Sequence, residues 1–421
     1  MNPPARHKIL IGLVVVVLGV VFFFWLNKAE GEYLSYDIPV YDATGLVGGS
    51  ITGTSTVAAE VELIKHLPTP EAVKAVYMTS CAAITPSLRN HVLKLIDETE
   101  LNSIVLDLKD YTGAISFNPL NEALKPYAVS HCPISDLKQL VADWHDKGIY
   151  VIGRITVFQD PLFTKNHPTE AVKSLNNPES LWRDKKGITY IDPASKLAHD
   201  HIISIARDAY DLGVDELNFD YIRFPSDGNM KDILLPITGG SKSKPLVLEE
   251  FFAYLAGELK PTGAVLSADV FGVITNHYSD VGIGQIWEHF LPYFDYISPM
   301  IYPSHYYSGF GSFSDPNLYP YEVVKDSLDT AVARTVSTST VVVTLNGKPI
   351  ASTSPQLYSK PAFSRAKIRP WLQDFDYPVP YTPDMVTAQI KATYDAGLNS
   401  WMMWDPTNTY TKSVYKMEFQ D

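Results

Sequence analysis

The sequence predicts an α/β protein: a (β/α)8 barrel of the TIM type, preceded by a single transmembrane helix and a flexible linker. Three observations support this prediction. Eight short runs alternate with helical stretches between residues 73 and 404, these runs are almost wholly apolar, and one long apolar segment stands near the N-terminus of the 421-residue chain. Near-continuous apolar strands that alternate with helices are typical of a parallel sheet covered on both faces.

The N-terminal segment is interpreted from its length and charge. Residues 1–8 form a short cytoplasmic end, and residues 9–26 carry no charged or polar side chain, which is just enough to cross a bilayer as a helix. Arg6 and Lys8 precede this run, so the rest of the chain is expected outside the cytoplasm. A cleaved signal peptide is the alternative, but no small-x-small cleavage pattern follows residue 26. We therefore expect a single-pass protein of the cell membrane with an extracytoplasmic domain.

The remaining chain divides into three predicted parts. Residues 27–70 are a linker because positions 43–57 are rich in Gly, Ser and Thr, residues 71–412 are the barrel, and residues 413–421 are a tail. The expected strands are 73–78, 103–108, 150–155, 216–219, 265–270, 296–300, 369–373 and 400–404. The expected helices are 87–99, 134–147, 195–212, 248–259, 317–335 and 383–396. Gly148, Gly213 and Gly397 each follow a helix as a left-handed cap. A doubly wound open sheet is the alternative fold, but no glycine-rich phosphate loop favours it.

Two stretches exceed a minimal barrel. Residues 156–193 leave the C-terminal end of the third strand, so we expect them on the face that carries the active site in this fold. Between the sixth helix and the seventh strand, residues 341–345 and 348–351 flank Asn346 and Gly347, which predicts a hairpin with a tight turn.

Composition excludes some functions. The net charge is −13 and no run of Lys or Arg occurs, so a nucleic acid would be repelled. The 12% of aromatic residues suits a carbohydrate, whose C–H faces stack on aromatic rings. Cys81 and Cys132 are either a disulfide or two unrelated core residues, and two cysteines without an HExxH motif do not make a zinc site. We expect no metal and no cofactor.

Acidic residues follow five of the eight strands, where active sites of this fold are built. They are Asp107, Asp220, Asp269, Asp374 and Asp405. Some of them are expected to form ion pairs with basic residues such as Arg154 and Arg223. Paired carboxylates beside aromatic rings are also what glycoside cleavage requires: one acid protonates the leaving oxygen, and the other attacks or activates water.

Four blocks carry a resemblance to a known family. They are 215–228 (DELNFDYIRFPSDG), 267–272 (SADVFG), 297–306 (ISPMIYPSHY) and 369–375 (RPWLQDF). These blocks resemble the signatures of the bacterial putative glycosyl hydrolase domain family, over roughly residues 72–410. The resemblance implies a barrel and a hydrolase role without a settled substrate.

A weaker similarity connects the chain to chitinase-type glycosidases. It implies that Asp220 matches the last acid of their strand-four motif, Tyr302 their strand-six tyrosine, and Trp404 the tryptophan that floors their sugar site. Ile222 stands where those enzymes place their acid Glu. Another residue must therefore supply the acid, and Asp269 on the neighbouring strand is our candidate, with Glu288 in reserve.

We therefore predict a glycoside hydrolase that acts on a cell-envelope or extracellular polysaccharide or oligosaccharide, with Asp220 as nucleophile or base and Asp269 as acid. Arg223, near Asp220 in sequence, is expected to tune the carboxylates, and the pKa of Asp269 is expected to be the raised one. The predicted substrate-binding residues are Asp107, Arg154, Arg223, Tyr302, His305, Asp374, Trp404 and Asp405. The alternatives are a non-catalytic carbohydrate-binding or envelope-structural barrel, and a metal-dependent deacetylase, for which the sequence has no His/Asp ligand cluster.

Overall fold

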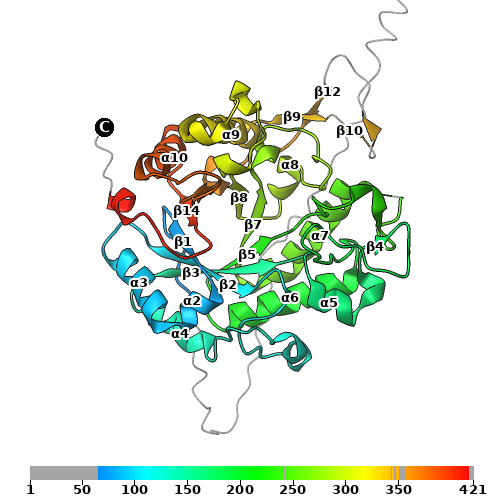
Figure 1. The fold of residues 1–421 in the computed structure, drawn as a ribbon, viewed down its shortest axis with the longest axis horizontal. Coiled ribbons are helices and arrows are strands. Elements are labelled where there is room, and N and C mark those ends of the chain that lie inside the picture. The colour runs from blue at the N-terminus through cyan, green and yellow to red at the C-terminus, as the bar shows by residue number, and fades with distance from the viewer. Residues whose placement is uncertain (1–64, 241, 343, 346–347, 350–355, 417–421) are drawn as a thin grey trace, which may run out of the picture. The chain divides into compact units, whose positions relative to one another are not determined.

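The computed structural model describes residues 65–416 apart from 241, 343, 346–347 and 350–355. Eight parallel strands close into a barrel in the order β1-β14-β13-β8-β7-β5-β3-β2 (Figure 1). They are β1 (Lys74–Met78), β2 (Ser103–Lys109), β3 (Tyr150–Thr156), β5 (Glu216–Asp220), β7 (Val265–Phe271), β8 (Tyr296–Met300), β13 (Trp371–Gln373) and β14 (Trp401–Trp404). Each overlaps the run predicted for it, so the barrel is confirmed and the alternative of an open sheet is wrong.

Helices surround the barrel (Figure 1). They are α2 (Ser80–Ile84), α3 (Pro86–Asp97), α4 (Leu137–His145), α5 (Pro161–Asn166), α6 (Lys196–Asp211), α7 (Lys244–Leu259), α8 (Trp287–Phe290), α9 (Pro320–Val336) and α10 (Pro383–Asp395). Capping residues fix where these helices begin and end. The side chains of Asp136 and Ser195 accept hydrogen bonds from backbone N–H groups at the starts of α4 and α6. Gly148 and Gly213 follow the same two helices at φ +73° and +101°, which confirms the predicted caps.

Buried apolar residues form three clusters, and the third of them (Val172, Trp182 and Tyr190) lies in the insertion after β3. A large cluster fills the space between the strands and the surrounding helices, and a smaller one lies inside the barrel. The inner cluster comprises Val73, Ala75, Tyr77, Val105, Tyr150, Ile152, Tyr302, Trp371 and Met402. Because side chains alternate along a strand, the residues two positions from these also face the barrel interior. We call the end of the barrel at the C-terminal ends of the strands the mouth. Polar side chains that face inward there are held within a packed protein interior.

The barrel includes residues that we had assigned to the flanking segments. The backbone N–H of Leu67 donates to Asp215 at 2.7 Å, and the hydroxyl of Thr69 lies 3.0 Å from that of Tyr150. At the other end, Tyr415 is fully buried. The packed unit thus extends beyond the predicted boundaries at 71 and 412, because these residues complete hydrogen bonds and apolar contacts that sequence pattern does not reveal.

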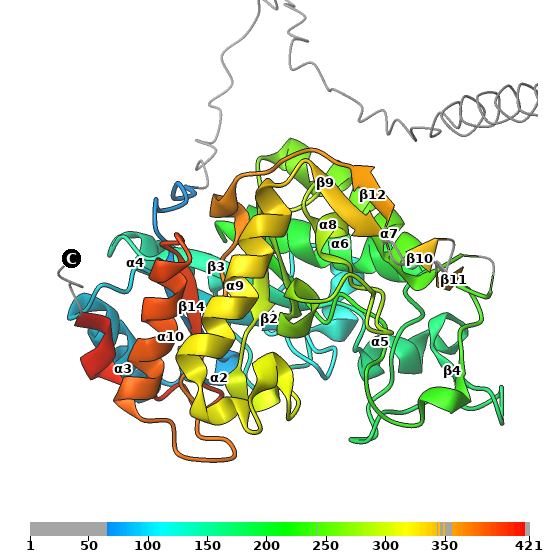
Figure 2. The same ribbon diagram turned by 90° about the horizontal axis from the view of Figure 1, so that it is seen from above.

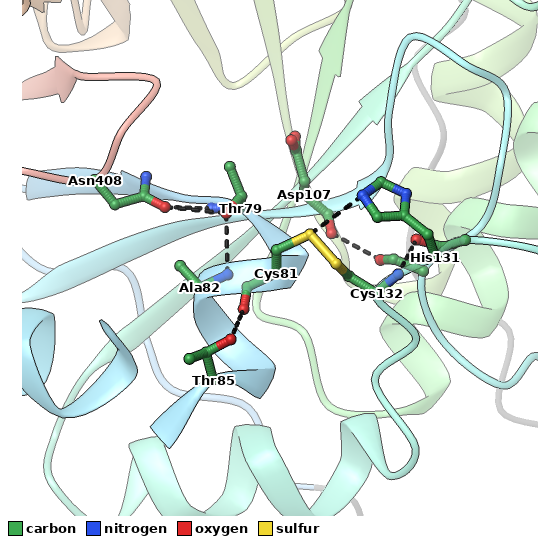
Figure 3. The surroundings of a disulfide bond; sticks show 10 residues. Thr79, Cys81, Ala82, Thr85, Asp107, His131, Cys132 and Asn408 are labelled. Atoms are coloured by element: carbon green, nitrogen blue, oxygen red, sulfur yellow. Dashed lines mark hydrogen bonds between the residues drawn. A yellow bond between two sulfur atoms is a disulfide. The ribbon is translucent and has the colours of Figure 1, made fainter. Parts of the chain in front are cut away.

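A disulfide joins Cys81 in α2 to Cys132 in the loop that precedes α4, with the Cα atoms 4.9 Å apart (Figure 3). This decides between the two alternatives left open by the sequence. The bond ties the first two loops of the mouth together, because α2 directly follows β1 and the loop follows β2. Nε2 of His131 lies 3.5 Å from the sulfur of Cys81.

The insertions form small sheets of their own. The insertion at residues 156–193 contains β4 (Lys173–Ser174), which pairs with β6 (Ile233–Leu234) in the loop after β5. The loops after β3 and β5 therefore meet, on the side of α5 and away from α3 (Figures 1 and 2). The predicted hairpin is confirmed: β10 (Thr344–Leu345) pairs antiparallel with β11 (Lys348–Pro349). A second pair that we had not expected, β9 (Ser339–Val342) with β12 (Gln356–Ser359), surrounds it in the chain.

The predicted anchor at residues 9–26 lies outside the described residues, as does the predicted linker up to residue 64. Among the helices that the structure describes, none is long and apolar enough to span a membrane.

Candidate active site at the mouth of the barrel

Asp269 lies near the C-terminal end of β7 and is 1% exposed. One carboxyl oxygen, Oδ1, accepts hydrogen bonds from Asn218 Nδ2 at 2.9 Å and from the indole Nε1 of Trp371 at 2.8 Å. The other oxygen, Oδ2, is buried and has no hydrogen-bond partner within the described part of the chain. Burial, and then the negative charge of Asp220, raise the pKa of Asp269 to about 8. At neutral pH this carboxyl therefore holds a proton, and Oδ2 is the free position for it.

Asp220 ends β5, the neighbouring strand, and is held by an arginine. Arg154 on β3 donates from Nε at 3.1 Å and from Nη2 at 2.5 Å to Oδ2 of Asp220, and the backbone N–H of Tyr221 donates to Oδ1 at 2.6 Å. The opposite nitrogen of Arg154, Nη1, donates to Asp107 on β2 at 2.5 Å. Since β3 lies between β2 and β5, the guanidinium connects two carboxylates across three adjacent strands. Such charge-assisted bonds fix the orientation of both acids.

Aromatic residues line the same region. The ring of Tyr77 stacks on Trp404 with centroids 4.0 Å apart, and its hydroxyl donates to Oδ2 of Asp107. The guanidinium of Arg154 lies over the Trp404 ring at 5.2 Å. Tyr302 is 8% exposed, and burial together with the charges of the two catalytic candidates raises its pKa well above the ordinary value. The phenol therefore stays protonated and keeps a hydroxyl donor at the mouth.

Arg223 does not act as the sequence suggested. Its guanidinium lies over the rings of Tyr221 and Phe271, at 4.9 and 4.6 Å, and its Nη1 donates to the carbonyl of Phe224. The chain turns sharply after Asp220, where Tyr221 adopts φ +51°, so closeness in sequence does not become contact. Arg154, 66 positions away in the chain, is the cation that binds Asp220.

Two further acids that we predicted as substrate-binding accept intramolecular hydrogen bonds, Asp374 at both oxygens and Asp405 at Oδ1. Asp374 accepts from the backbone and hydroxyl of Thr411, at 2.8 and 2.6 Å, and from the hydroxyl of Tyr415 at 2.5 Å. Asp405 accepts from the backbone and hydroxyl of Thr407, both at 2.6 Å. These carboxylates anchor the C-terminal segment and a turn, because a buried acid is costly unless it is paired.

The reserve acid Glu288 is also committed. Arg334 donates to it from Nε at 2.8 Å and from Nη2 at 2.5 Å, and Thr340 donates at 2.9 Å. Burial acts to raise the pKa of Glu288, but these hydrogen bonds and the arginine charge hold it below the ordinary value. A carboxylate kept ionised in this way is a poor proton donor.

Sequence reasoning did not find Asn218 and Trp371, which hold Asp269. Asn218 lies two positions before Asp220 on the same strand, so alternation alone places it on the same face. The indole of Trp371 reaches Asp269 across 102 positions of sequence, and no local pattern signals that contact. His305 is exposed, and its Nδ1 lies 2.8 Å from the hydroxyl of Ser304.

Metal ligation has little support among the described residues. Their one group with ligand spacing is Cys81, His131 and Cys132, and its two sulfurs are bonded to each other rather than present as thiolates.

Comparison with known proteins gives a family and a fold. A family model described as "Putative glycosyl hydrolase domain" matches residues 75–410. A hypothetical protein from Ruminiclostridium thermocellum ATCC 27405 is 34% identical, over 46% of this chain and 97% of that one, with a TM-score of 0.42. The glycoside hydrolase domain of PgaB (BpsB) from Bordetella bronchiseptica is 16% identical, over 82% and 99%, with a TM-score of 0.53, which shows a shared fold. None of the curated proteins matches the chain.

Proposed function

Because the chain belongs to the putative glycosyl hydrolase domain family, we propose that it hydrolyses O-glycosidic bonds of a cell-envelope or extracellular polysaccharide. Asp269 is the general acid, and Asp220 is the nucleophile or the base. The observation that carries this proposal is the buried carboxyl of Asp269, whose Oδ2 has no hydrogen-bond partner among the described residues and whose neighbour is a second carboxylate at the same end of the barrel. A buried carboxyl with a raised pKa beside a second carboxyl that an arginine binds is an arrangement suited to acid and base roles.

The reaction follows from the different partners of the two acids. Asp269 donates its proton to the leaving glycosidic oxygen while the anionic Asp220, held by Arg154, attacks the anomeric carbon or deprotonates a water molecule. If Asp220 attacks, its negative charge disappears in the glycosyl ester. The pKa of Asp269 then falls, since that charge is one of the causes that raise it, and Asp269 can accept the proton of the incoming water.

Other residues at the mouth support the two acids. Arg154 orients Asp220 for attack, and Tyr302 and Trp404 present aromatic surface and a hydroxyl where a sugar ring would lie.

The disulfide supports the placement of this domain outside the cytoplasm, since disulfides persist in oxidising compartments. Membrane attachment through residues 9–26 is part of the same proposal.

A non-catalytic carbohydrate-binding barrel is the second candidate. It is favoured by the full occupation of Asp220, whose two oxygens already accept from Arg154 and from the backbone of Tyr221. In that case the acids would have only a structural role, and Arg154 would not release Asp220 to a reacting sugar.

The release of reducing ends from a panel of envelope and extracellular polysaccharides separates the two candidates. We expect turnover by the wild type, loss of turnover in Asp220→Asn, and unchanged turnover in Asp97→Asn, an exposed acid on α3 that serves as control. Binding of a polysaccharide without any release of reducing ends would favour the non-catalytic barrel.

A further inference from the structure

A contiguous row of rings leads from the acids to the surface on the side of β8 and β13. It consists of Tyr302, Phe375, His305 and Tyr377, and we call it the aromatic row. The centroid of Tyr302 lies 5.6 Å from Phe375 and 5.5 Å from His305, and His305 lies 6.0 Å from Tyr377. Exposure increases outward, from 8% at Tyr302 through the partly exposed Phe375 to 57% at Tyr377.

Exposed aromatic residues are common singly and need no explanation. These rings differ because each contacts the next one in the row. In addition, the charges of Asp269 and Asp220 raise the pKa of the innermost residue, Tyr302. An exposed apolar surface that continues into a reactive site is a mark of ligand binding.

The aromatic row is held in place by one buried side chain. Gln373 is fully buried, and its Nε2 donates to the carbonyls of Phe375 and Tyr377 at 3.0 and 3.3 Å. Its Oε1 accepts from the backbone N–H of Ser304 at 3.3 Å, so the loops after β8 and β13 are joined. Gln389 on α10 in turn accepts from the backbone N–H of Gln373 and donates to its carbonyl, at 2.9 and 2.8 Å. The backbone that carries Phe375 and Tyr377 is therefore held in place before a ligand arrives, which lowers the entropic cost of binding.

The charges around the row limit what it can bind. Residues 302–307 and 373–378 contain no Lys or Arg, but they contain Asp374 and Asp376. An anionic sugar such as a uronic acid would find no cation there. A sugar without formal charge would place its C–H face on the rings and a hydroxyl against the imidazole of His305.

We infer that the aromatic row is a subsite for uncharged sugar units that lie beyond the scissile bond, so that the substrate is an uncharged glycan chain of several units. This inference rests on the proposed function, since it places the cleaved bond at Asp220 and Asp269. The units on the row bind remote from the reaction, and their binding energy positions the bond that is cleaved.

The test compares Tyr377→Ala with Tyr377→Phe, which keeps the ring, and with Tyr111→Ala, which removes a tyrosine of similar exposure, 54%, from the loop after β2. The probes are an array of uncharged and uronic-acid glycans of one to eight units, and the polysaccharide panel used for turnover. We expect wild-type binding to uncharged chains and to increase with length. Tyr377→Ala should weaken binding of the longer chains by roughly 3- to 10-fold, the loss of one aromatic contact, and leave the shortest ones unchanged. Tyr377→Phe and Tyr111→Ala should behave as wild type.

The outcomes distinguish the inference from the proposed function. Turnover by the wild type with no effect of Tyr377→Ala on any chain length would overturn the subsite and leave the hydrolase intact. Chain binding that depends on Tyr377, without turnover of any polysaccharide, would support the subsite and overturn the hydrolase. Binding of uronic-acid chains alone, or of no glycan, would overturn the inference. Unfolding temperatures check that the exposed Tyr377 can be truncated without loss of the fold.

Discussion

Asp269→Asn is the substitution that most directly tests the acid at the mouth. An Asn side chain keeps an oxygen that can accept from both Asn218 and Trp371, and its amide nitrogen takes the position of Oδ2. It therefore resembles the protonated carboxyl, in shape and in charge. We expect a folded variant that has lost its transferable proton.

The effect on stability depends on pH, and the structure sets its sign. The pKa of Asp269 rises from 3.8 to about 8 on folding, so the folded state binds more protons than the unfolded state between those values. Stability contributed by this group is therefore present at acid pH, decreases as pH rises from about 4 to about 8, and is constant above that. A shift of four pKa units at 1.36 kcal/mol each corresponds to a loss on the order of 5 kcal/mol. The Asn side chain of the Asp269→Asn variant does not titrate, so the variant does not lose this stability as pH rises.

Urea unfolding of both proteins across this pH range measures the difference. The stability of Asp269→Asn relative to wild type should increase as pH rises through the window and then level off. Its kcat/KM should be about 10²- to 10⁴-fold lower, the usual contribution of a general acid. Wild-type activity should fall as pH exceeds about 8, where Asp269 loses its proton. A stability difference that does not change with pH, or a variant with wild-type kcat/KM, would refute the reasoning.

Three other predictions concern different links in the structure. Arg154→Met should lower the free energy of unfolding by about 3–5 kcal/mol and abolish turnover, because two buried carboxylates lose their cation; urea unfolding beside a polysaccharide assay measures both, and a stable, active variant would contradict it. Cys81→Ser should lower stability by about 4 kcal/mol, the chain-entropy estimate for a loop of 51 residues. Cys132→Ser and reduction of the wild type should match it, and additive losses in the double variant would argue against a single shared bond. Intact mass of membrane-extracted protein should include residues 9–26, whereas a mature chain that begins near residue 30 would show that the segment is cleaved.

Much of the fold could be predicted because its signals are local. Each strand of the barrel is a short apolar run, and three of the helices, α4, α6 and α10, are followed by a glycine with positive φ, namely Gly148, Gly213 and Gly397. The antiparallel pairing of β9 with β12 was missed, because the turn signal between them, Asn346-Gly347, predicts only the inner hairpin of β10 and β11.

For the candidate site too, local features could be predicted from the sequence and long-range contacts could not. Sequence alone determined that acids lie at the C-terminal ends of the strands, because the position of a residue along a strand specifies at which end of the barrel it lies. It also determined that Asp220 and Asp269 belong to consecutive strands of the barrel. Only the tertiary structure decided which of the acids are paired. Asp374 and Asp405 bind nearby backbone and hydroxyl groups, Glu288 binds Arg334, and Asp269 has one oxygen without a partner in the described part of the chain. The physical reason is that the protonation state of a buried carboxyl depends on its burial and on nearby charges and hydrogen bonds. At Asp269 these come from β3, β5 and β13, which the chain brings together only when the barrel closes.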